Sequence, residues 1–321
     1  MGEFELIRHY FAAAPCAQPG GAVALGIGDD CALLALGAGE HLAVSTDTLV
    51  EGVHFPVGCD PFLLGQRSLA VAASDLAAMG ATPIGFTLAL TLPQFAASWL
   101  QAFSAGLGQM AAGGPLRLVG GDTTRGPLSI TLTVFGSTPA GAALTRGGAR
   151  AGDLLCVGGP LGDAAGALPL VLGQRSAGAE VAEPLLARYW SPAPQFALGC
   201  ALRGLASAAL DISDGLLADC GHIALASGLA LQVERARLPL SNALVAFLGL
   251  DAARDAALTG GDDYVLAFTL PPHHLSALQA AGWPITVVGC AVVGHGVSLI
   301  DERGQDITPP VRGYQHFRET P

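Results

Sequence analysis

The sequence predicts a two-domain α/β protein in which strands and helices alternate. Its 321 residues are 51% hydrophobic and only 13% charged, so the chain can bury a large core, and its length is typical of two domains. A segment rich in glycine, proline and small residues, 136–152, interrupts the alternation and is the best candidate for a boundary. We therefore predict an N-terminal domain over residues 1–140 and a C-terminal α/β domain over residues 141–321.

The N-terminal half shows both strand and helix periods. From Ile84 to Leu92, large apolar residues alternate with smaller ones, as in a half-buried strand. The predicted strands cover 42–47, 84–92, 116–119 and 128–135, and the predicted helices cover 60–79 and 95–112. The stretch 76–116 carries no charged side chain, but prolines, glutamines and glycines break it, so a strand followed by a helix is favoured over a membrane span.

A second α/β unit follows the boundary segment. The predicted strands cover 153–157, 208–212, 229–233, 264–270 and 285–288, and the predicted helices begin at about 163, cover 214–226 and follow the two prolines at 271–272. A glycine-rich turn at 158–162 follows the first of these strands, but it lacks both the full dinucleotide-binding fingerprint and a lysine.

Composition excludes several classes of partner. A net charge of -11 and a pI near 5.0 argue against nucleic acid, because no basic stripe exists to neutralise its phosphates. The seven cysteines form no C-x-x-C pair, which argues against a zinc site or a disulfide framework. Acidic residues stand near the N-terminus where a signal peptide would be positive. We expect a cytoplasmic protein without nucleic-acid or membrane partners.

Aspartates recur beside glycine and hydroxyl residues at six places, which are 28–30, 45–47, 74–75, 120–124, 211–215 and 260–263. Mg²⁺ bound to polyphosphate takes carboxylate and phosphate oxygens as ligands, so this pattern favours such a site. The chain contains no lysine, which both a Walker A loop and a protein kinase require. If the protein handles nucleotide phosphates, we expect Mg²⁺, arginine and backbone amides to hold them.

Each cluster alone also has a purely structural interpretation. The acids at 29–30 are compatible with an ordinary turn, and 120–124 with a hairpin loop. Ser213 or Asp214 is a suitable N-cap for the helix that follows, although a helix N-terminus with a hydroxyl is also a ready phosphate site. The recurrence of six such clusters favours function over six unrelated turns.

Asp75 and the histidines leave further alternatives open. Asp75 lies on a helix face of apolar and small residues, so its carboxylate is either paired, for which Arg67 is a candidate, or holds a metal. The histidines at 54, 222 and 316 are isolated in the sequence, and an isolated histidine is more often structural.

The clusters, in their order along the chain, resemble those of the thiamine-monophosphate kinase family. The resembling segments are Gly26–Ala32, Ser45–Phe55, Ser74–Ala81, Leu118–Thr124, Leu144–Arg146, Asp211–Leu216 and Gly313–Phe317. The similarity covers nearly the whole chain. This family shares a superfamily with aminoimidazole ribonucleotide synthetase, selenophosphate synthetase and a hydrogenase-maturation protein, all of which use ATP without a Walker lysine.

The resemblance implies a fold, substrates and a site. The protein would be a homodimer of two-domain subunits. The mixed sheets of the two α+β N-terminal domains would join into a barrel, and each N-terminal domain would pack on a C-terminal α/β domain. The substrates would be ATP and thiamine monophosphate. Motif matches imply Mg²⁺ ligands at Asp30, Ser45, Thr46, Asp47, Asp75, Asp122, Asp211 and Asp214, ATP contacts at Gly121, Asp122, Arg146 and Ser213, and thiamine-phosphate contacts at His54, Asp262 and Tyr314. The family usually carries glutamate where this chain has Asp262.

Other members of the superfamily are expected to differ in features that the sequence tests. A selenophosphate synthetase would carry a reactive cysteine and a lysine near its N-terminus, and this chain has no lysine. A hydrogenase-maturation protein would end in cysteine, whereas this chain ends in proline. Aminoimidazole ribonucleotide synthetase remains the enzymatic alternative. A nucleotide-binding regulator without turnover is the alternative from another class.

The implied reaction has simple chemical requirements. A phosphate monoester has a second pKa near ~6, so at neutral pH the acceptor is mostly a nucleophilic dianion and needs no general base. Catalysis then rests on positioning and on neutralising charge, and we expect direct in-line transfer assisted by Mg²⁺. The apolar strands 84–92 and 128–135 are expected to be sheet edges that a dimer would bury.

Overall fold

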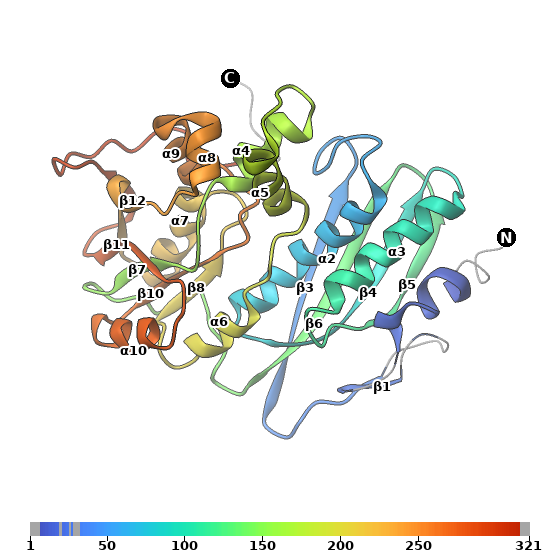
Figure 1. The fold of residues 1–321 in the computed structure, drawn as a ribbon. Coiled ribbons are helices and arrows are strands. Elements are labelled where there is room, and N and C mark those ends of the chain that lie inside the picture. The colour runs from blue at the N-terminus through green and yellow to red at the C-terminus, as the bar shows by residue number, and fades with distance from the viewer. Residues whose placement is uncertain (1–6, 19–20, 26, 28–32, 315–321) are drawn as a thin grey trace. The chain divides into compact units, whose positions relative to one another are not determined.

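The computed structural model describes residues 7–18, 21–25, 27 and 33–314, and its contacts divide the chain into two units (Figure 1). The N-terminal unit comprises Met1–Leu76 and Ala81–Ala142, and the C-terminal unit comprises Ala77–Gly80 and Ala143–Pro321. The boundary between the two units, at 142/143, lies two residues beyond the boundary expected at 140/141. The sequence did not indicate that 77–80, which includes the end of a helix, would group with the second unit.

The N-terminal unit is built on a four-stranded sheet with two helices on one face (Figure 1). The strand order is β3 (Glu40–Val50), β6 (Ser129–Pro139), β4 (Thr82–Leu92) and β5 (Leu118–Arg125), in which only β4 and β5 are parallel. Helices α2 (Pro61–Ala78) and α3 (Ala97–Ala111) cover the sheet, and the small strands β1 (Val23–Leu25) and β2 (Leu33–Leu34) pair beside the short helical segments Ile7–Ala12 and Pro15–Ala17. These positions confirm the predicted helices and the predicted strands at 42–47, 84–92 and 128–135, whereas β5 overlaps the predicted strand 116–119 only at 118–119.

The two faces of this sheet differ in chemistry. Phe86, Leu88 and Leu90 of β4 are buried and lie on one face, the face from which Ser45 of β3 contacts α2. The opposite face carries threonines joined across strands, with Thr46 bonded to Thr133. Val44 is 55% exposed there, and no helix of this unit's described residues covers that face (Figure 1).

Two expectations for the N-terminal unit are wrong. The segment 120–125 is part of strand β5 and not a loop, because it pairs with β4 along its length. A Cβ on Gly121 would lie 1.9 Å from the carbonyl oxygen of Leu88, so the close approach of the two strands requires glycine. The predicted edge strands, 84–92 and 128–135, correspond to β4 and β6 and lie inside the sheet, where sequence-distant neighbours pair on both sides.

The C-terminal unit contains a six-stranded sheet. Its order is β12 (Gly296–Ile300), β9 (Ala230–Glu234), β11 (Thr286–Val292), β7 (Leu154–Val157), β10 (Leu266–Leu270) and β8 (Ala208–Asp211), and only β12 and β9 are parallel. Its helices are α4 (Asp163–Val171), α5 (Ala179–Trp190), α6 (Phe196–Leu202), α7 (Leu216–Ser227), α8 (Asn242–Leu248), α9 (Leu250–Thr259) and α10 (Leu275–Ala280). The five predicted strands and the helices near 163, 214–226 and 272 are confirmed, whereas β12, α5, α6, α8 and α9 were not predicted.

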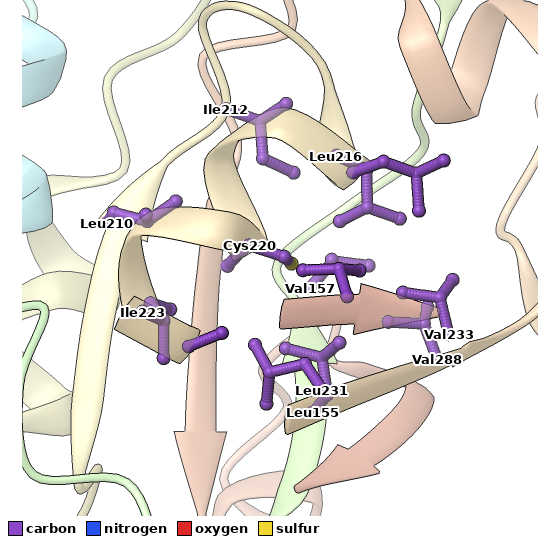
Figure 2. Close-up of a cluster of buried hydrophobic side chains, with 14 of the residues drawn as sticks. Leu155, Val157, Leu210, Ile212, Leu216, Cys220, Ile223, Leu231, Val233 and Val288 are labelled. Atoms are coloured by element: carbon purple, nitrogen blue, oxygen red, sulfur yellow. The ribbon is translucent and has the colours of Figure 1, made fainter. Parts of the chain in front are cut away.

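Helix α7 is fixed against one face of this sheet by the core that Figure 2 shows. Leu216, Cys220 and Ile223 of α7 pack against strand residues that include Leu155 and Leu231. Cys156 and Phe268 belong to a second core cluster, to which Leu198 and Leu202 of α6 also belong. This core places α7 against β8, whose Leu210 belongs to the same cluster. No helix among the described residues is long and apolar enough to cross a membrane.

Candidate functional site

Ser45, Asp47 and Asp75 form one cluster in the N-terminal unit. Ser45 and Asp47 are two residues apart on β3, so their side chains lie on the same face of the sheet, toward α2. The Ser45 hydroxyl donates to Oδ2 of Asp75 on α2. Burial, and then the negative charge of Asp75, raise the pKa of Asp47 to about 6.

This cluster has the donor set that Mg²⁺ prefers. Two carboxylates and a hydroxyl are hard oxygen ligands, and no ion pair of the described residues involves Asp47 or Asp75. A divalent cation would offset the repulsion between the two acids. The set is nevertheless partial, because no three His, Cys, Asp or Glu side chains of the described residues are grouped closely enough to hold a metal.

Asp122 lies elsewhere in the same sheet. Cross-strand register aligns Asp122 of β5 with Ala89 and, through the intervening strands, with Thr48, whereas Asp47 is in the next row. Alternation along a strand therefore places Asp122 on the sheet face opposite to Asp47. Strands β3 and β5 are also the two edges of the sheet, roughly 14 Å apart at ordinary strand spacing. One copy of the sheet does not bring Asp122 to Asp47.

Thr46 is held by a cross-strand hydrogen bond and His54 by a local one. The hydroxyls of Thr46 and Thr133 are 2.9 Å apart on the uncovered face, so the Thr46 side chain points away from Asp47. His54 follows β3, and its Nδ1 accepts a hydrogen bond of 3.0 Å from the backbone N–H of Val50. Because Nδ1 is an acceptor, the neutral ring carries its proton on Nε2. The backbone thus sets both the orientation and the tautomer of His54.

The turn 213–215 is the centre of the second group of candidate residues. Oδ2 of Asp219 accepts the backbone N–H groups of Ser213, Asp214 and Gly215 at 3.0, 3.0 and 3.1 Å. The expected cap by Ser213 or Asp214 is wrong, since Gly215 is the N-cap of α7 and no side chain caps it there. Those three amides are therefore engaged by Asp219 and not directed at a phosphate.

The carbonyl groups of the same turn join two other candidate segments. Ser213 O accepts the N–H of Asp262 at 2.9 Å, and Asp214 O accepts the N–H of Tyr314 at 3.0 Å. A Cβ on Gly261 would lie 2.3 Å from Ser213 O, so glycine is needed for this approach. The structure thus brings together the segments 211–215, 260–264 and 313–314, which were predicted separately.

Asp262 has a strained backbone within this assembly. Its φ is 69°, in the left-handed region, and that of Tyr264 is 50°. The Tyr264 hydroxyl donates to Oδ1 of Asp262 at 3.1 Å, which orients the carboxylate. Tyr314 is 48% exposed, whereas Asp211 at the end of β8 is buried.

Two buried acids that accept backbone N–H groups were not chosen as site candidates in the sequence. Besides Asp219, the buried Asp263 accepts the Gly162 N–H with both oxygens, at 2.8 and 2.9 Å, and burial raises the pKa of Asp263 well above its ordinary value. Burial is also the main cause that raises the pKa of Asp219 to about 6. An acid in the first helical turn after a glycine-containing turn was the signal available for Asp219.

Arg146 lies apart from the turn 213–215. Its carbonyl accepts the hydroxyl of Ser227, the last residue of α7, at 3.3 Å, whereas Ser213 precedes the first residue of that helix. An α-helix of this length spans about 18 Å. The separation argues against contact of Arg146 and Ser213 with the same phosphate group. Asp30 lies outside the described residues.

Comparison with known proteins gives consistent matches over the chain. The family model of the AIR synthase related protein, N-terminal domain, matches residues 28–138. The thiamine-monophosphate kinase of Escherichia coli (strain K12) is 44% identical over 322 residues, which cover 98% of each chain. The crystal structure of thiamine-monophosphate kinase from Stenotrophomonas maltophilia K279a is 47% identical, with a TM-score of 0.82, over 87% of this chain and 91% of that chain. The structure of AaThiL complexed with AMPPCP and TMP is 30% identical, with a TM-score of 0.80, over 88% and 89%.

Proposed function

The chain belongs to the thiamine-monophosphate kinase family, and we infer that it transfers the γ-phosphoryl group of ATP to thiamine monophosphate, forming thiamine diphosphate and ADP. The observation that carries this proposal is the 44% identity with the Escherichia coli kinase over 98% of both chains. The related AaThiL structure holds AMPPCP and TMP together, which supports the same pair of substrates. The reaction would be the last step of thiamine diphosphate biosynthesis, in the cytoplasm.

The residues on each unit have different roles in this proposal. Asp47 and Asp75, with the Ser45 hydroxyl holding Asp75, would bind Mg²⁺, which when bound supplies positive charge against the phosphates. The full proposed ligand set is Asp30, Ser45, Thr46, Asp47, Asp75, Asp122, Asp211 and Asp214. Gly121, Asp122, Arg146 and Ser213 would contact ATP, and His54, Asp262 and Tyr314 would contact thiamine monophosphate.

We propose that the protein is a homodimer whose N-terminal sheets join into a barrel. The uncovered threonine face and the exposed Val44 support pairing of this face with a second copy. If β3 of one copy pairs with β5 of the other about a two-fold axis, both open edges are closed. The same pairing would place β5 of the second copy, which carries Asp122, next to β3, which carries Asp47, and we propose that the ligand set that one sheet leaves partial is shared between the two copies.

Phosphate would pass directly from ATP to the acceptor. The acceptor is already anionic at neutral pH, so a covalent enzyme intermediate would add a step without providing a better nucleophile. With γ-labelled ATP and no acceptor, we expect no label on the protein. Label that appears on the protein and is chased into product would contradict direct transfer.

An acceptor panel tests the function itself. The purified protein, with Mg·ATP, would be given thiamine monophosphate, thiamine, formylglycinamidine ribonucleotide or selenide, and ADP release would be measured. We expect release only with thiamine monophosphate. Release only with the ribonucleotide would identify an aminoimidazole ribonucleotide synthetase, and no acceptor-dependent release would identify a binding protein without turnover.

A further inference from the structure

Asp219 occupies an unusual position behind the turn 213–215. Asp219 is 4% exposed and lies in the first turn of α7, whose apolar side packs into the core. One carboxylate oxygen accepts three consecutive backbone N–H groups, at 3.0 to 3.1 Å. Burying a carboxylate is costly unless hydrogen bonds compensate, and these three bonds offset part of that cost.

The bonds to Asp219 determine which way the turn faces. Because three N–H groups converge on one buried oxygen, the neighbouring carbonyls of Ser213 and Asp214 are directed elsewhere. They accept the N–H groups of Asp262 and Tyr314, at 2.9 and 3.0 Å. The Asp219 carboxylate therefore fixes the turn to which the segments 260–264 and 313–314 are bonded, and all three segments carry candidate site residues.

We propose that Asp219 is a positioning residue for the phosphoryl transfer, which holds Ser213 and Asp214 in register with Asp262 and Tyr314 without touching a substrate. This inference rests on the proposed function. A carboxylate is not needed merely to begin a helix, since an uncharged serine or asparagine at the N-cap serves that purpose without burying a charge. Three acceptor bonds to one oxygen instead produce a turn that is ordered before any ligand binds.

Asp219→Asn tests the proposal, with Asp301→Asn, at a less buried turn aspartate, as the control. Asp301 likewise uses one carboxylate oxygen, Oδ1, to accept two backbone N–H groups of a turn, at 2.9 and 2.8 Å. That turn follows β12, at the edge of the sheet opposite to β8. Both substitutions remove one charge from a turn, but only one of the turns carries candidate site residues.

The measurements separate positioning from general stability. Kinetic constants, the Mg²⁺ concentration for half-maximal rate, calorimetric binding of Mg²⁺ with a nonhydrolysable ATP analogue, and the melting temperature would be obtained for each variant. We expect Asp219→Asn to lower kcat, or to raise the Mg²⁺ concentration for half-maximal rate, by about 10- to 100-fold, as for other residues that orient metal ligands. The variant should also bind the analogue more weakly. For Asp301→Asn, the same quantities should stay within about twofold of their wild-type values. Equal behaviour of the two variants would overturn the proposal.

Hydrogen exchange on the wild-type protein provides a test that needs no variant. We expect the amides of Ser213, Asp214 and Gly215 to be protected in the ligand-free protein as strongly as those inside α7. Fast exchange that slows only when nucleotide binds would refute the ordered turn, even if the variant does not fold. A wild-type protein without kinase activity would instead refute the proposed function, and the exchange result would still decide whether the turn is ordered before any ligand binds.

Discussion

The aspartates of the two units differ in what their oxygens contact. In the N-terminal unit, Asp47 and Asp75 face a hydroxyl and each other, and no backbone amide or arginine of the described residues neutralises them. In the C-terminal unit, Asp219 and Asp263 accept backbone N–H groups and are buried. Aspartates in the two units thus serve two purposes. Carboxylates that accept no backbone N–H group indicate a place for a cation, and those that do indicate a scaffold.

The largest expected effect comes from the N-terminal cluster. Asp75→Asn should lower turnover by roughly 10³-fold, because it removes charge stabilisation at the phosphates, while the protein stays folded. Kinetics at several Mg²⁺ concentrations, with circular dichroism to check folding, would measure this. Asp60→Asn is the control, because Asp60 caps the other end of the same helix through the N–H of Phe62 and asparagine caps equally well. Near-normal Mg²⁺-dependent activity of Asp75→Asn would remove Asp75 from the site.

A complementation experiment asks where the missing N-terminal ligand comes from. If Asp75 of one copy works with the partner's Asp122, each variant alone is inactive. Dimers that mix Asp75→Asn with Asp122→Asn would then contain one intact site. Random mixing should restore about a quarter of wild-type activity, because half of the dimers are mixed and half of their sites are intact. Absence of any recovery in a verified mixed dimer would place both residues in the site of one chain.

A smaller effect is expected from removing Arg146, whose positive charge is proposed to contact ATP directly. Arg146→Ala should weaken ATP binding about tenfold and leave thiamine-monophosphate binding nearly unchanged, because a charge-assisted contact to the nucleotide is lost. Titration calorimetry with each ligand would measure both affinities, and Arg150→Ala in the same exposed segment is the control. Equal weakening for both ligands would point to a structural role near the domain boundary.

The smallest effect concerns stability in the C-terminal scaffold. Burial raises the pKa of Asp263 in the folded protein, so its contribution to stability is complete below the ordinary aspartate pKa of about 4 and is lost as the pH rises toward the folded value. Asp263→Asn keeps an acceptor for the Gly162 N–H but cannot ionise. We expect its stability to fall less than that of the wild type between pH 5 and pH 8 in denaturant titrations. If the variant and the wild type lose the same stability over this pH range, Asp263 does not cause the loss.

The predictions of strands and helices were correct where the sequence pattern within the segment determines its structure, and wrong where distant segments determine it. The alternation in 84–92 was sufficient to predict strand β4, because the period of two arises within the strand itself. The segment 120–125 looks like a turn locally, and it becomes a strand only because β4 provides a parallel partner. The placement of β4 and β6 inside the sheet was likewise decided by distant strands.

The site shows the same division. The order of the motifs was enough to place the chain in its family and to name Asp47, Asp75 and Ser213 as candidates, because residue type and spacing carry chemistry directly. Only the tertiary structure decided that Ser45 holds Asp75, that Asp122 lies across the sheet from Asp47, and that Asp219 orders the turn on which three segments meet. The reason is physical. Whether a carboxylate is satisfied depends on the groups that folding brings within hydrogen-bonding distance, and these come from residues far away in the chain.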